Sequence, residues 1–273
     1  MLVIDSHIHL WRENVPSPPH RQIAAWSAEE AMKEMDAAGV DAAVIQPPNW
    51  DPNANAVAED AAQRYPNRFA ILGWFPPEKQ ESRALVAEWK QRPGQKGLRF
   101  TFMRPGQENW ASDGTMEWLW PAAERAGLVI AMGAAKFLPV VGQIAERYPG
   151  LKLVVDHFGA PPRATGDAVW ANQPVLLGLA RHKNIAVKVS GGPSLSTLPY
   201  PFRDVAKPIR EIYDAYGPQR MFWGTDITRL TTPWKQCVTH FTEELPWLSE
   251  RDKELIMGRA LCDWYGWDLP DSK

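Results

Sequence analysis

The chain has 273 residues, 45% of them hydrophobic, which is enough for one large buried core and fits the roughly 250 residues of an eightfold β/α barrel. A formal net charge of −2 excludes an electrostatic basis for binding nucleic acid or an anionic membrane. No apolar stretch approaches the roughly 20 residues that span a bilayer, and two cysteines, Cys237 and Cys262, are too few for a disulfide framework. We therefore expect a cytoplasmic protein with no secretory signal, because chemistry-bearing residues already begin at Asp5.

Eight short runs with the composition of buried strands recur along the chain. Most are apolar at nearly every position, as is typical of parallel strands that are covered on both faces. In chain order the runs are Leu2 to His7, Asp41 to Gln46, Phe69 to Phe75, Gly97 to Phe100, Leu128 to Met132, Lys152 to His157, Ile185 to Ser190 and Met221 to Asp226.

Between these runs lie stretches that are amphipathic or rich in Ala and Glu, and most of them stop at a Pro or a Gly. The first begins at Ser27, where Ser-Ala-Glu-Glu has the spacing of a capping box, and ends at Gly39. Further helices are expected over Ala54 to Tyr65, Glu81 to Gln91, Met116 to Ala126, Leu138 to Tyr148, Pro174 to His182, Val205 to Tyr216 and Ser249 to Cys262.

This alternation predicts an α/β fold, a (β/α)8 TIM barrel that forms one domain over residues 1–273. A doubly wound open sheet is the alternative, but no Gly-rich phosphate loop follows the first strand. The segments Pro16 to Pro19 and Gly192 to Arg203 are expected to be long loops that form a lid or a pocket wall.

Polar residues mark the ends of several predicted strands, which is where the active site of such a barrel lies. His7 and His9 are two residues apart on one strand, so their side chains are expected to point to the same face. Two imidazoles and the carboxylate of Asp226 make a suitable ligand set for zinc or manganese. His157 is expected to complete this set or to act as an acid or base beside it. A structural role is the alternative for each residue taken singly.

Other polar and aromatic residues follow the predicted strands. Arg99 is expected either at the cavity or in a salt bridge that holds a loop, and Lys188 on either face of its strand. Asp156 is expected to face away from its neighbour His157, and Ser190 lies at the end of the seventh strand. Candidate substrate-binding residues are Arg104, Arg163 and Arg229, with surface arginines as the alternative, and Trp50 and Trp74, with core packing as the alternative. Three further histidines, His20, His182 and His240, are expected at the surface.

Five short motifs occur in a fixed order along the chain. They are Ile4-Asp5-Ser6-His7-Ile8-His9, Lys96-Gly97-Leu98-Arg99, Val155-Asp156-His157-Phe158-Gly159-Ala160-Pro161, Val187-Lys188-Val189-Ser190-Gly191 and Phe222-Trp223-Gly224-Thr225-Asp226. The set resembles the amidohydrolase-related (amidohydrolase 2) branch of the metal-dependent hydrolases. Within that branch it is most similar to the group of TIM-barrel sugar-lactone and 2-pyrone-4,6-dicarboxylate lactonases. The resemblance covers essentially the whole chain.

The resemblance implies a hydrolase in which His7 and His9 are metal ligands of the first strand. Asp226 would be the acid of the eighth strand that activates water and also contacts the metal. His157 would polarise or protonate the substrate, and Arg99 would contact a carboxylate or carbonyl oxygen.

The chain departs from the family pattern at three strand ends. Two-metal members need a bridging lysine or glutamate at the end of the fourth strand, where this chain has Arg99-Phe100. One-metal members often carry a histidine after the fifth strand, where this chain has Met132-Gly133. We therefore expect zero or one divalent metal, and metal-independent catalysis stays an alternative. Ile227-Thr228 replaces the usual Trp-Pro, which is expected to reshape the pocket beside Asp226.

Three functions are weighed. The first is a lactonase that opens a small carboxylated or polyhydroxylated lactone with water activated by Asp226, because a lactone is a more reactive substrate than an amide. The second is a nonoxidative decarboxylase of an aromatic or enol carboxylic acid. The third is a barrel that binds a ligand without turnover. The expected partner is a small-molecule substrate, with no nucleic acid and no membrane, and a homo-oligomer is compatible with the sequence.

Overall fold

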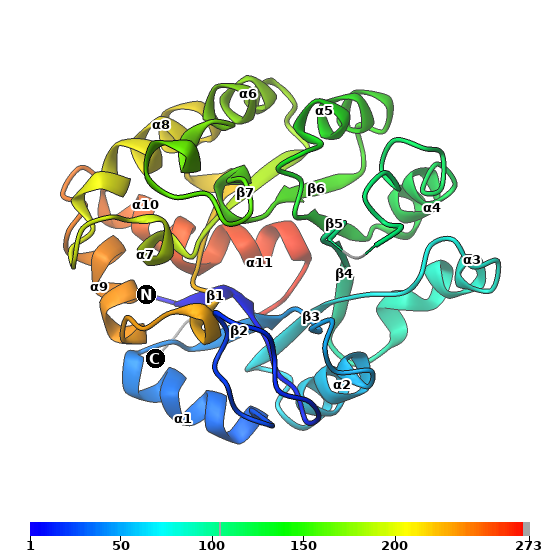
Figure 1. Ribbon diagram of the computed structural model, residues 1–273, viewed down its shortest axis with the longest axis horizontal. Helices are drawn as coiled ribbons and strands as arrows, with labels where there is room; N and C mark the ends of the chain where they lie inside the picture. Colours follow the sequence, from blue (N-terminus) through cyan, green and yellow to red (C-terminus); the bar gives the residue numbers. More distant parts are fainter. Residues whose placement is uncertain (104, 270–273) are drawn as a thin grey trace.

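Eight parallel strands make up the centre of the molecule, and helices surround them as a ring (Figure 1). The structure is a computed structural model that describes residues 1–103 and 105–269. The strands, hydrogen-bonded to their neighbours in chain order, are β1 (Ile4–Ile8), β2 (Ala42–Ile45), β3 (Phe69–Gly73), β4 (Gln95–Phe100), β5 (Val129–Met132), β6 (Lys152–Val155), β7 (Ile185–Ser190) and β8 (Met221–Gly224). The predicted (β/α)8 barrel is confirmed.

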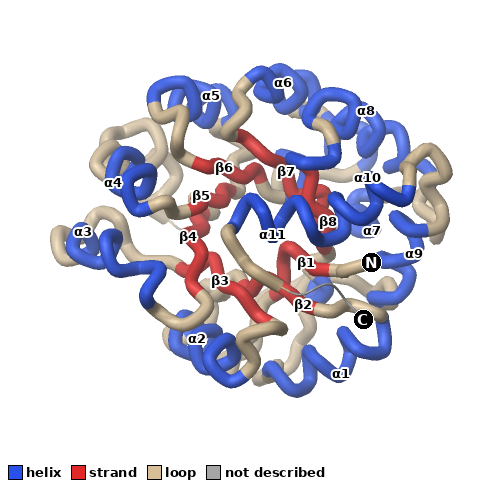
Figure 2. The backbone as a smooth tube through the Cα atoms, turned by 180° about the vertical axis from the view of Figure 1, so that it is seen from behind, coloured by secondary structure: helices blue, strands red, loops and turns tan. Residues whose placement is uncertain are grey.

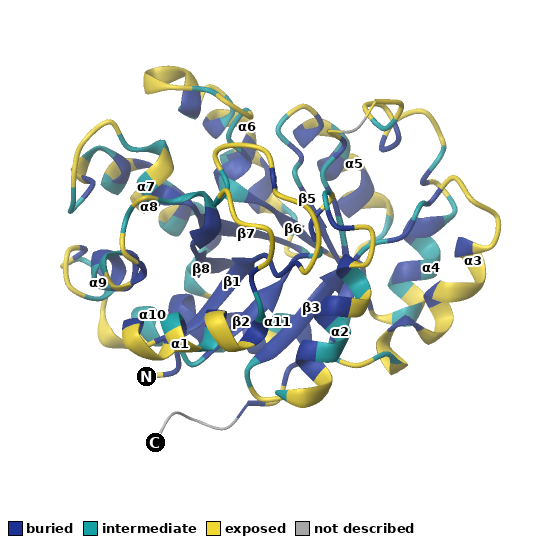
Figure 3. Cartoon of the chain, turned by 60° about the horizontal axis from the view of Figure 1, so that its bottom comes forward, coloured by how far each residue is buried: buried dark blue, intermediate teal, exposed yellow. Residues whose placement is uncertain are grey.

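Helices of different lengths surround the strands, and the last of them closes one end of the ring. They are α1 (Ala28–Ala38), α2 (Ala54–Arg64), α3 (Ser82–Leu85), α4 (Leu119–Ala126), α5 (Leu138–Arg147), α6 (Gln173–Gly178), α7 (Gly192–Leu195), α8 (Ala206–Tyr216), α9 (Trp234–Thr242), α10 (Glu250–Glu254) and α11 (Ala260–Tyr265). The predicted capping box is present, because the Ser27 hydroxyl accepts from the Glu30 N–H and the Glu30 carboxylate accepts from the Ser27 N–H. Figure 3 shows the strands buried and the exposed residues on the outer faces of the helices.

Several elements differ from the sequence prediction. The segment Gly192 to Arg203, which was expected to be a loop, begins with the short helix α7, and the helix predicted over Glu81 to Gln91 is α3 followed by a 3₁₀ helix over Val86–Gln91. Helix α9 was not predicted, because its sequence contains several residues of modest helix propensity. Its buried side chains, which include Trp234 and Phe241, stabilise it by packing. The helix predicted over Ser249 to Cys262 is divided into α10 and α11 by a π-helical turn at Leu255–Arg259.

Closure of the barrel between β1 and β8 depends on one carboxylate and one glycine. Asp5 accepts hydrogen bonds from the Thr225 N–H at 2.9 Å and from the Trp234 indole at 3.0 Å, so it joins β1, β8 and α9. A Cβ atom at Gly224 would lie only 2.3 Å from the Ser6 hydroxyl. Glycine therefore allows the first and last strands to approach each other.

The amino-terminal end of the barrel is closed by α11 and the residues after it, which cross the ring of strands (Figure 2). Tyr265 and Trp267 pack against the apolar side chains that fill the barrel interior. Lys96 of β4 donates to the Gly266 carbonyl at 3.0 Å, and Lys152 of β6 donates to the Trp264 carbonyl at 2.9 Å. Apolar burial and these hydrogen bonds together hold the segment in place.

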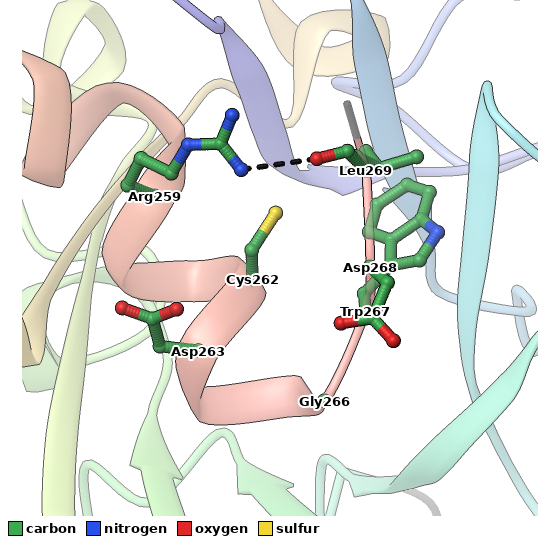
Figure 4. A pocket seen from close by; sticks show the side chains of 7 residues that line it. All are labelled: Arg259, Cys262, Asp263, Gly266, Trp267, Asp268 and Leu269. Carbon is green, nitrogen blue, oxygen red and sulfur yellow. Dashed lines mark hydrogen bonds between the residues drawn. The ribbon is translucent and has the colours of Figure 1, made fainter. Parts of the chain in front are cut away.

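A pocket beside α11 contains one of the two cysteines, and it is lined by Arg259, Cys262, Asp263, Gly266, Trp267, Asp268 and Leu269 (Figure 4). Burial raises the pKa of the Cys262 thiol to about 11, so the thiol is protonated and a weak nucleophile near pH 7. Cys237 is buried too, and both cysteines are free, as predicted. Within the described ranges, no helix combines the length and the apolar character needed to cross a membrane.

Candidate active site

Four side chains from distant parts of the sequence meet at the carboxyl-terminal rim of the barrel. His9 Nε2 lies 3.4 Å from Asp226 Oδ1, and His157 Nε2 lies 4.0 Å from Asp226 Oδ2. The ring centres of His7 and His157 are 4.4 Å apart. The Asp226 side chain is only 4% exposed and lies at the centre of this cluster.

The direction of His7 and His9 depends on an irregularity in β1. Ile4 points into the barrel interior, so strict alternation along the strand would turn His7 outward. The register of β1 against β2 shifts between Asp5 and Ile8, and Ile8 packs in the outer core between strands and helices. This β-bulge changes the alternation, so that both histidines face the cluster around Asp226.

His157 and Asp226 lie just beyond their strands, whereas the sequence predicted them as the last strand residues. Both have left-handed backbone conformations, with φ of 50° and 55°, and Phe158 follows with φ of 59°. Such conformations cost non-glycine residues roughly 1–3 kcal/mol each and persist only where other contacts enforce them. The Asp226 N–H donates to the His7 carbonyl at 2.9 Å, and the Ser190 hydroxyl lies 2.8 Å from His157 Nδ1. These contacts direct both side chains into the rim.

The protonation of His9 follows from its hydrogen bond. Its Nδ1 lies 2.6 Å from the backbone oxygen of Gln46, which can only accept, so Nδ1 carries a proton. In the neutral ring, Nε2 then presents a lone pair to Asp226 Oδ1, which has no hydrogen-bond partner among the described residues. Two acceptors that face each other require a proton or a cation between them.

The donor atoms fit a divalent metal ion. Both ring nitrogens of His7 are buried and have no hydrogen-bond partner in the described part of the chain. One group that can hold an ion consists of His7, His157 and Asp226, and a second consists of His9, His20 and Asp226. Within each group, the ligand atoms lie within 4.8 Å of one another. Imidazole nitrogen with carboxylate oxygen suits zinc or manganese, and the two groups share one carboxylate.

Arg99 points toward the cluster but forms a buried ion-pair network. Its Nε lies 2.6 Å from Asp156 Oδ2, and Lys188 Nζ lies 3.0 Å from Asp156 Oδ1. The side chains of Asp156 and Lys188 are fully buried, and that of Arg99 is 13% exposed. Both alternatives for Arg99 thus hold in part, because it lies near the site and is also held by a salt bridge. One carboxylate stands against two cations, which leaves net positive charge beside His7.

This charge distribution shifts the acid–base properties of the cluster. Burial lowers the pKa of His7 well below its ordinary value, and the charge of Arg99 lowers it further. Burial also lowers the pKa of His157 to about 4, although the neighbouring carboxylates oppose the shift. For Asp226, burial alone would raise the pKa, but the interactions with the facing His9 ring, His157 and Arg229 outweigh burial and lower it. Near pH 7 the cluster therefore contains an ionised carboxylate beside the neutral rings of His7 and His157.

The predicted substrate-binding arginines differ in position. Arg229 Nη1 lies 3.5 Å from Asp226 Oδ2, so this arginine is at the site. Arg163 follows β6 and is exposed, and no hydrogen bond or ion pair joins it to the cluster within the described residues. Arg104 lies outside the described residues.

The two tryptophans that were candidates for substrate binding differ in position, and Trp50 lies against the histidines. Its ring centre lies 5.5 Å from that of His9 and 4.6 Å from that of His20. Trp74 is half-buried after β3, where its backbone exchanges hydrogen bonds with the Asn55 side chain. Trp50 thus borders the histidine cluster directly.

Two of the three histidines that were expected at the surface are not there. His20 lies in the loop between β1 and α1 and reaches the site, where its Nδ1 is 2.9 Å from the Thr228 hydroxyl. His240 is 2% exposed and packs against Phe202. His182 is partly exposed and remote from the rim, and His20 also keeps part of its surface exposed at the site. The signal for His20 was its place after Pro16 to Pro19, in a loop that was already expected to cover the strand ends.

The family assignment rests on a match over nearly the whole chain. The model of the amidohydrolase family matches residues 4–270. The chain belongs to this family. This agrees with the resemblance that its five motifs show.

Two curated relatives are lactone hydrolases. An L-fucono-1,5-lactonase of Burkholderia ambifaria is 26% identical over 227 residues, which cover 77% of this chain and 75% of that protein. A 4-sulfomuconolactone hydrolase of Hydrogenophaga intermedia is 28% identical over 207 residues, which cover 72% of this chain and 64% of that protein.

Solved structures show the same fold. An amidohydrolase of Burkholderia multivorans with bound zinc has a TM-score of 0.83 and 21% identity, over 99% of this chain and 100% of that one. A 5-carboxyvanillate decarboxylase of Sphingomonas paucimobilis has a TM-score of 0.69 and 15% identity, over 98% of this chain and 99% of that one. Amidohydrolase barrels of this shape therefore occur among hydrolases and decarboxylases alike.

Proposed function

We propose that the protein is a lactonase that opens a small carboxylated or polyhydroxylated lactone. The observation that carries the proposal is the buried Asp226 carboxylate at the rim, which lies 3.4 Å from His9 and 4.0 Å from His157. The two curated relatives, which both act on lactones, support it further. A carboxylate with a lowered pKa is a weak base, so it suits an activated ester better than an amide.

In the proposed reaction, Asp226 accepts a proton from a water molecule as the water oxygen attacks the lactone carbonyl carbon. Negative charge then develops on the carbonyl oxygen, where Arg99 and His157 would stabilise it. The ring C–O bond breaks, and the proton held by Asp226 passes to the leaving oxygen. The products are the open hydroxy acid and the unchanged enzyme.

We further propose one divalent ion, zinc or manganese, held by His7, His9 and Asp226. Such an ion lowers the pKa of a bound water toward about 7 and polarises a carbonyl oxygen. The orphaned nitrogens of His7 and the orphaned Oδ1 of Asp226 support this assignment. Activity after treatment with a chelator, with and without added zinc or manganese, distinguishes the metal-dependent from the metal-independent reaction.

Substrate binding is proposed for the side chains at the edge of the cluster. Arg229 would contact a substrate carboxylate, since it lies beside Asp226 and can donate two parallel hydrogen bonds. Trp50 would pack against the ring of the lactone. Arg104, Arg163 and Trp74 stay predictions, as do a cytoplasmic location and a homo-oligomer.

The test is hydrolysis of a lactone panel by the wild type, by Asp226→Asn and by Asp167→Asn, a control at an exposed acid. The panel includes L-fucono-1,5-lactone, 4-sulfomuconolactone and 2-pyrone-4,6-dicarboxylate. We expect ring opening to fall by roughly 10²–10⁴-fold in Asp226→Asn only, because a general base contributes about that much. Carbon dioxide release from an aromatic acid without lactone opening would favour the decarboxylase instead.

A further inference from the structure

We propose that His20, carried by the loop between β1 and α1, is a ligand of the metal ion together with His9 and Asp226. The ligand atoms of these three residues lie within 4.8 Å of one another. The ring centres of His9 and His20 are 5.3 Å apart at an interplanar angle of 74°. This inference rests on the proposed metal site, to whose ligands it adds His20, but it does not depend on lactone hydrolysis.

The loop holds His20 in place on both sides of the residue. The next residue, Arg21, donates its backbone N–H to the Thr228 carbonyl at 2.8 Å, which ties the loop to the segment after β8. The Arg21 guanidinium also binds Glu34 of α1 through two hydrogen bonds, at 2.6 and 2.7 Å. Such bidentate pairs fix geometry as well as adding stability. His20 is therefore positioned before any ligand arrives.

The hydrogen bond of His20 leaves one nitrogen for an ion. Nδ1 lies 2.9 Å from the Thr228 hydroxyl, and the other ring nitrogen has no hydrogen-bond partner among the described residues. When Nδ1 donates to the hydroxyl, Nε2 keeps a lone pair, which is the tautomer that a metal-ligating histidine needs. Thr228 thus has the role of a residue that orients a ligand. The replacement of the usual Trp-Pro by Ile227-Thr228 therefore supplies the hydroxyl that orients His20.

The Asp226 carboxylate distinguishes the two candidate groups. Its Oδ2 already faces the Arg229 guanidinium at 3.5 Å, on the side where His157 Nε2 lies 4.0 Å away. Its Oδ1 lies 3.4 Å from His9 Nε2 and has no hydrogen-bond partner within the described ranges. A cation is therefore repelled on the Oδ2 side and meets two lone pairs on the Oδ1 side. The electrostatics favour the group that contains His20.

The experiment measures binding of Zn²⁺ and Co²⁺ to the metal-stripped full chain by calorimetry and by the cobalt absorption spectrum. The variants are His20→Ala, Thr228→Val and the control His182→Ala, which removes a histidine remote from the rim. We expect about one ion per chain and a loss of affinity well beyond tenfold in His20→Ala, with a changed cobalt spectrum. Thr228→Val should lower the affinity for the ion by roughly 10–100-fold, as is usual when the hydrogen-bond partner of a metal ligand is removed. His182→Ala should bind as the wild type does.

Unchanged affinity and an unchanged cobalt spectrum in folded His20→Ala would overturn the proposal and leave the ion on the set His7, His9 and Asp226. Absence of Zn²⁺ binding by the wild type would overturn it as well. If His20→Ala does not fold, as judged by circular dichroism, Thr228→Val decides the question. Weaker ion binding in Thr228→Val supports the proposal, and unchanged ion binding contradicts it. Lactone hydrolysis is assayed separately. Failure of that assay with intact ion binding would affect only the proposed function.

Discussion

A single buried carboxylate, Asp156, holds two cationic side chains in the barrel interior, so its removal should be costly. In Asp156→Asn, Arg99 and Lys188 would be left buried without their counter-ion, and we expect the free energy of unfolding to fall by roughly 3–5 kcal/mol. The control is Asp214→Asn, which removes the exposed helical ion pair with Arg210 and should cost less than about 1 kcal/mol. Urea unfolding measures both. Equal losses in the two variants would contradict the role assigned to Asp156.

The titration of one buried residue, His240, should make the free energy of unfolding depend on pH. Burial lowers its pKa from 6.5 to about 4, so in acid the unfolded chain takes up a proton before the folded chain does. This stabilisation is complete above pH 6.5 and is lost as the pH falls toward 4. Between pH 7 and pH 5, the decrease in the free energy of unfolding should be about 2 kcal/mol smaller in His240→Phe than in the wild type. Urea titrations at the two pH values check this, and identical losses would refute it.

Residues of the site were predictable where the signal was local. His7, His9, His157 and Asp226 could be assigned because each follows an apolar run. His20 could not, since the path of the 19-residue loop between Ile8 and Ala28 is set by tertiary contacts such as those of Arg21 with Glu34. His240 was misplaced for a related reason. The helix that buries it was itself not predicted.

Among the elements, close approach of β4 and β5 makes one glycine indispensable. A Cβ at Gly97 would lie 1.9 Å from the Val129 carbonyl oxygen, which is backbone and cannot move aside. We expect Gly97→Ala to lower the free energy of unfolding by about 3 kcal/mol or more. Gly178 ends α6 and has no atom within 4 Å of its Cβ position, so Gly178→Ala should be neutral or stabilise by up to about 1 kcal/mol. Thermal unfolding of both variants tests the contrast, and a well-folded Gly97→Ala would argue against it.

Element positions followed from the sequence wherever apolar runs and capping residues agreed. All eight strands and the capped helix α1 lie within a few residues of their predicted positions. The β-bulge in β1 was not predictable, because Asp5 and Ile8 give no local sign that the register shifts between them. The split of the last predicted helix depends on a contact outside it, since a Cβ at Gly258 would lie 2.6 Å from the Leu2 carbonyl. Such features arise from packing between elements.

At the scale of the whole molecule, α11 and the residues after it cover the amino-terminal end of the barrel. Substitutions there should change the free energy of unfolding more than the catalytic activity. Tyr265 is 2% exposed, and its hydroxyl is buried without a hydrogen-bond partner in the described part of the chain. Tyr265→Ala should cost roughly 3–5 kcal/mol, whereas Tyr265→Phe should be neutral or stabilising by about 1 kcal/mol, because it removes an unpaired polar group. Guanidinium unfolding gives both values. A large loss in Tyr265→Phe would show that the hydroxyl is paired.

The covered amino-terminal end of the barrel also determines how small molecules reach the site. With Tyr265 and Trp267 packed beneath the strands, the described residues leave the carboxyl-terminal rim as the side from which a small molecule would reach Asp226. An opened hydroxy acid that stays bound there would therefore compete directly with the next lactone molecule.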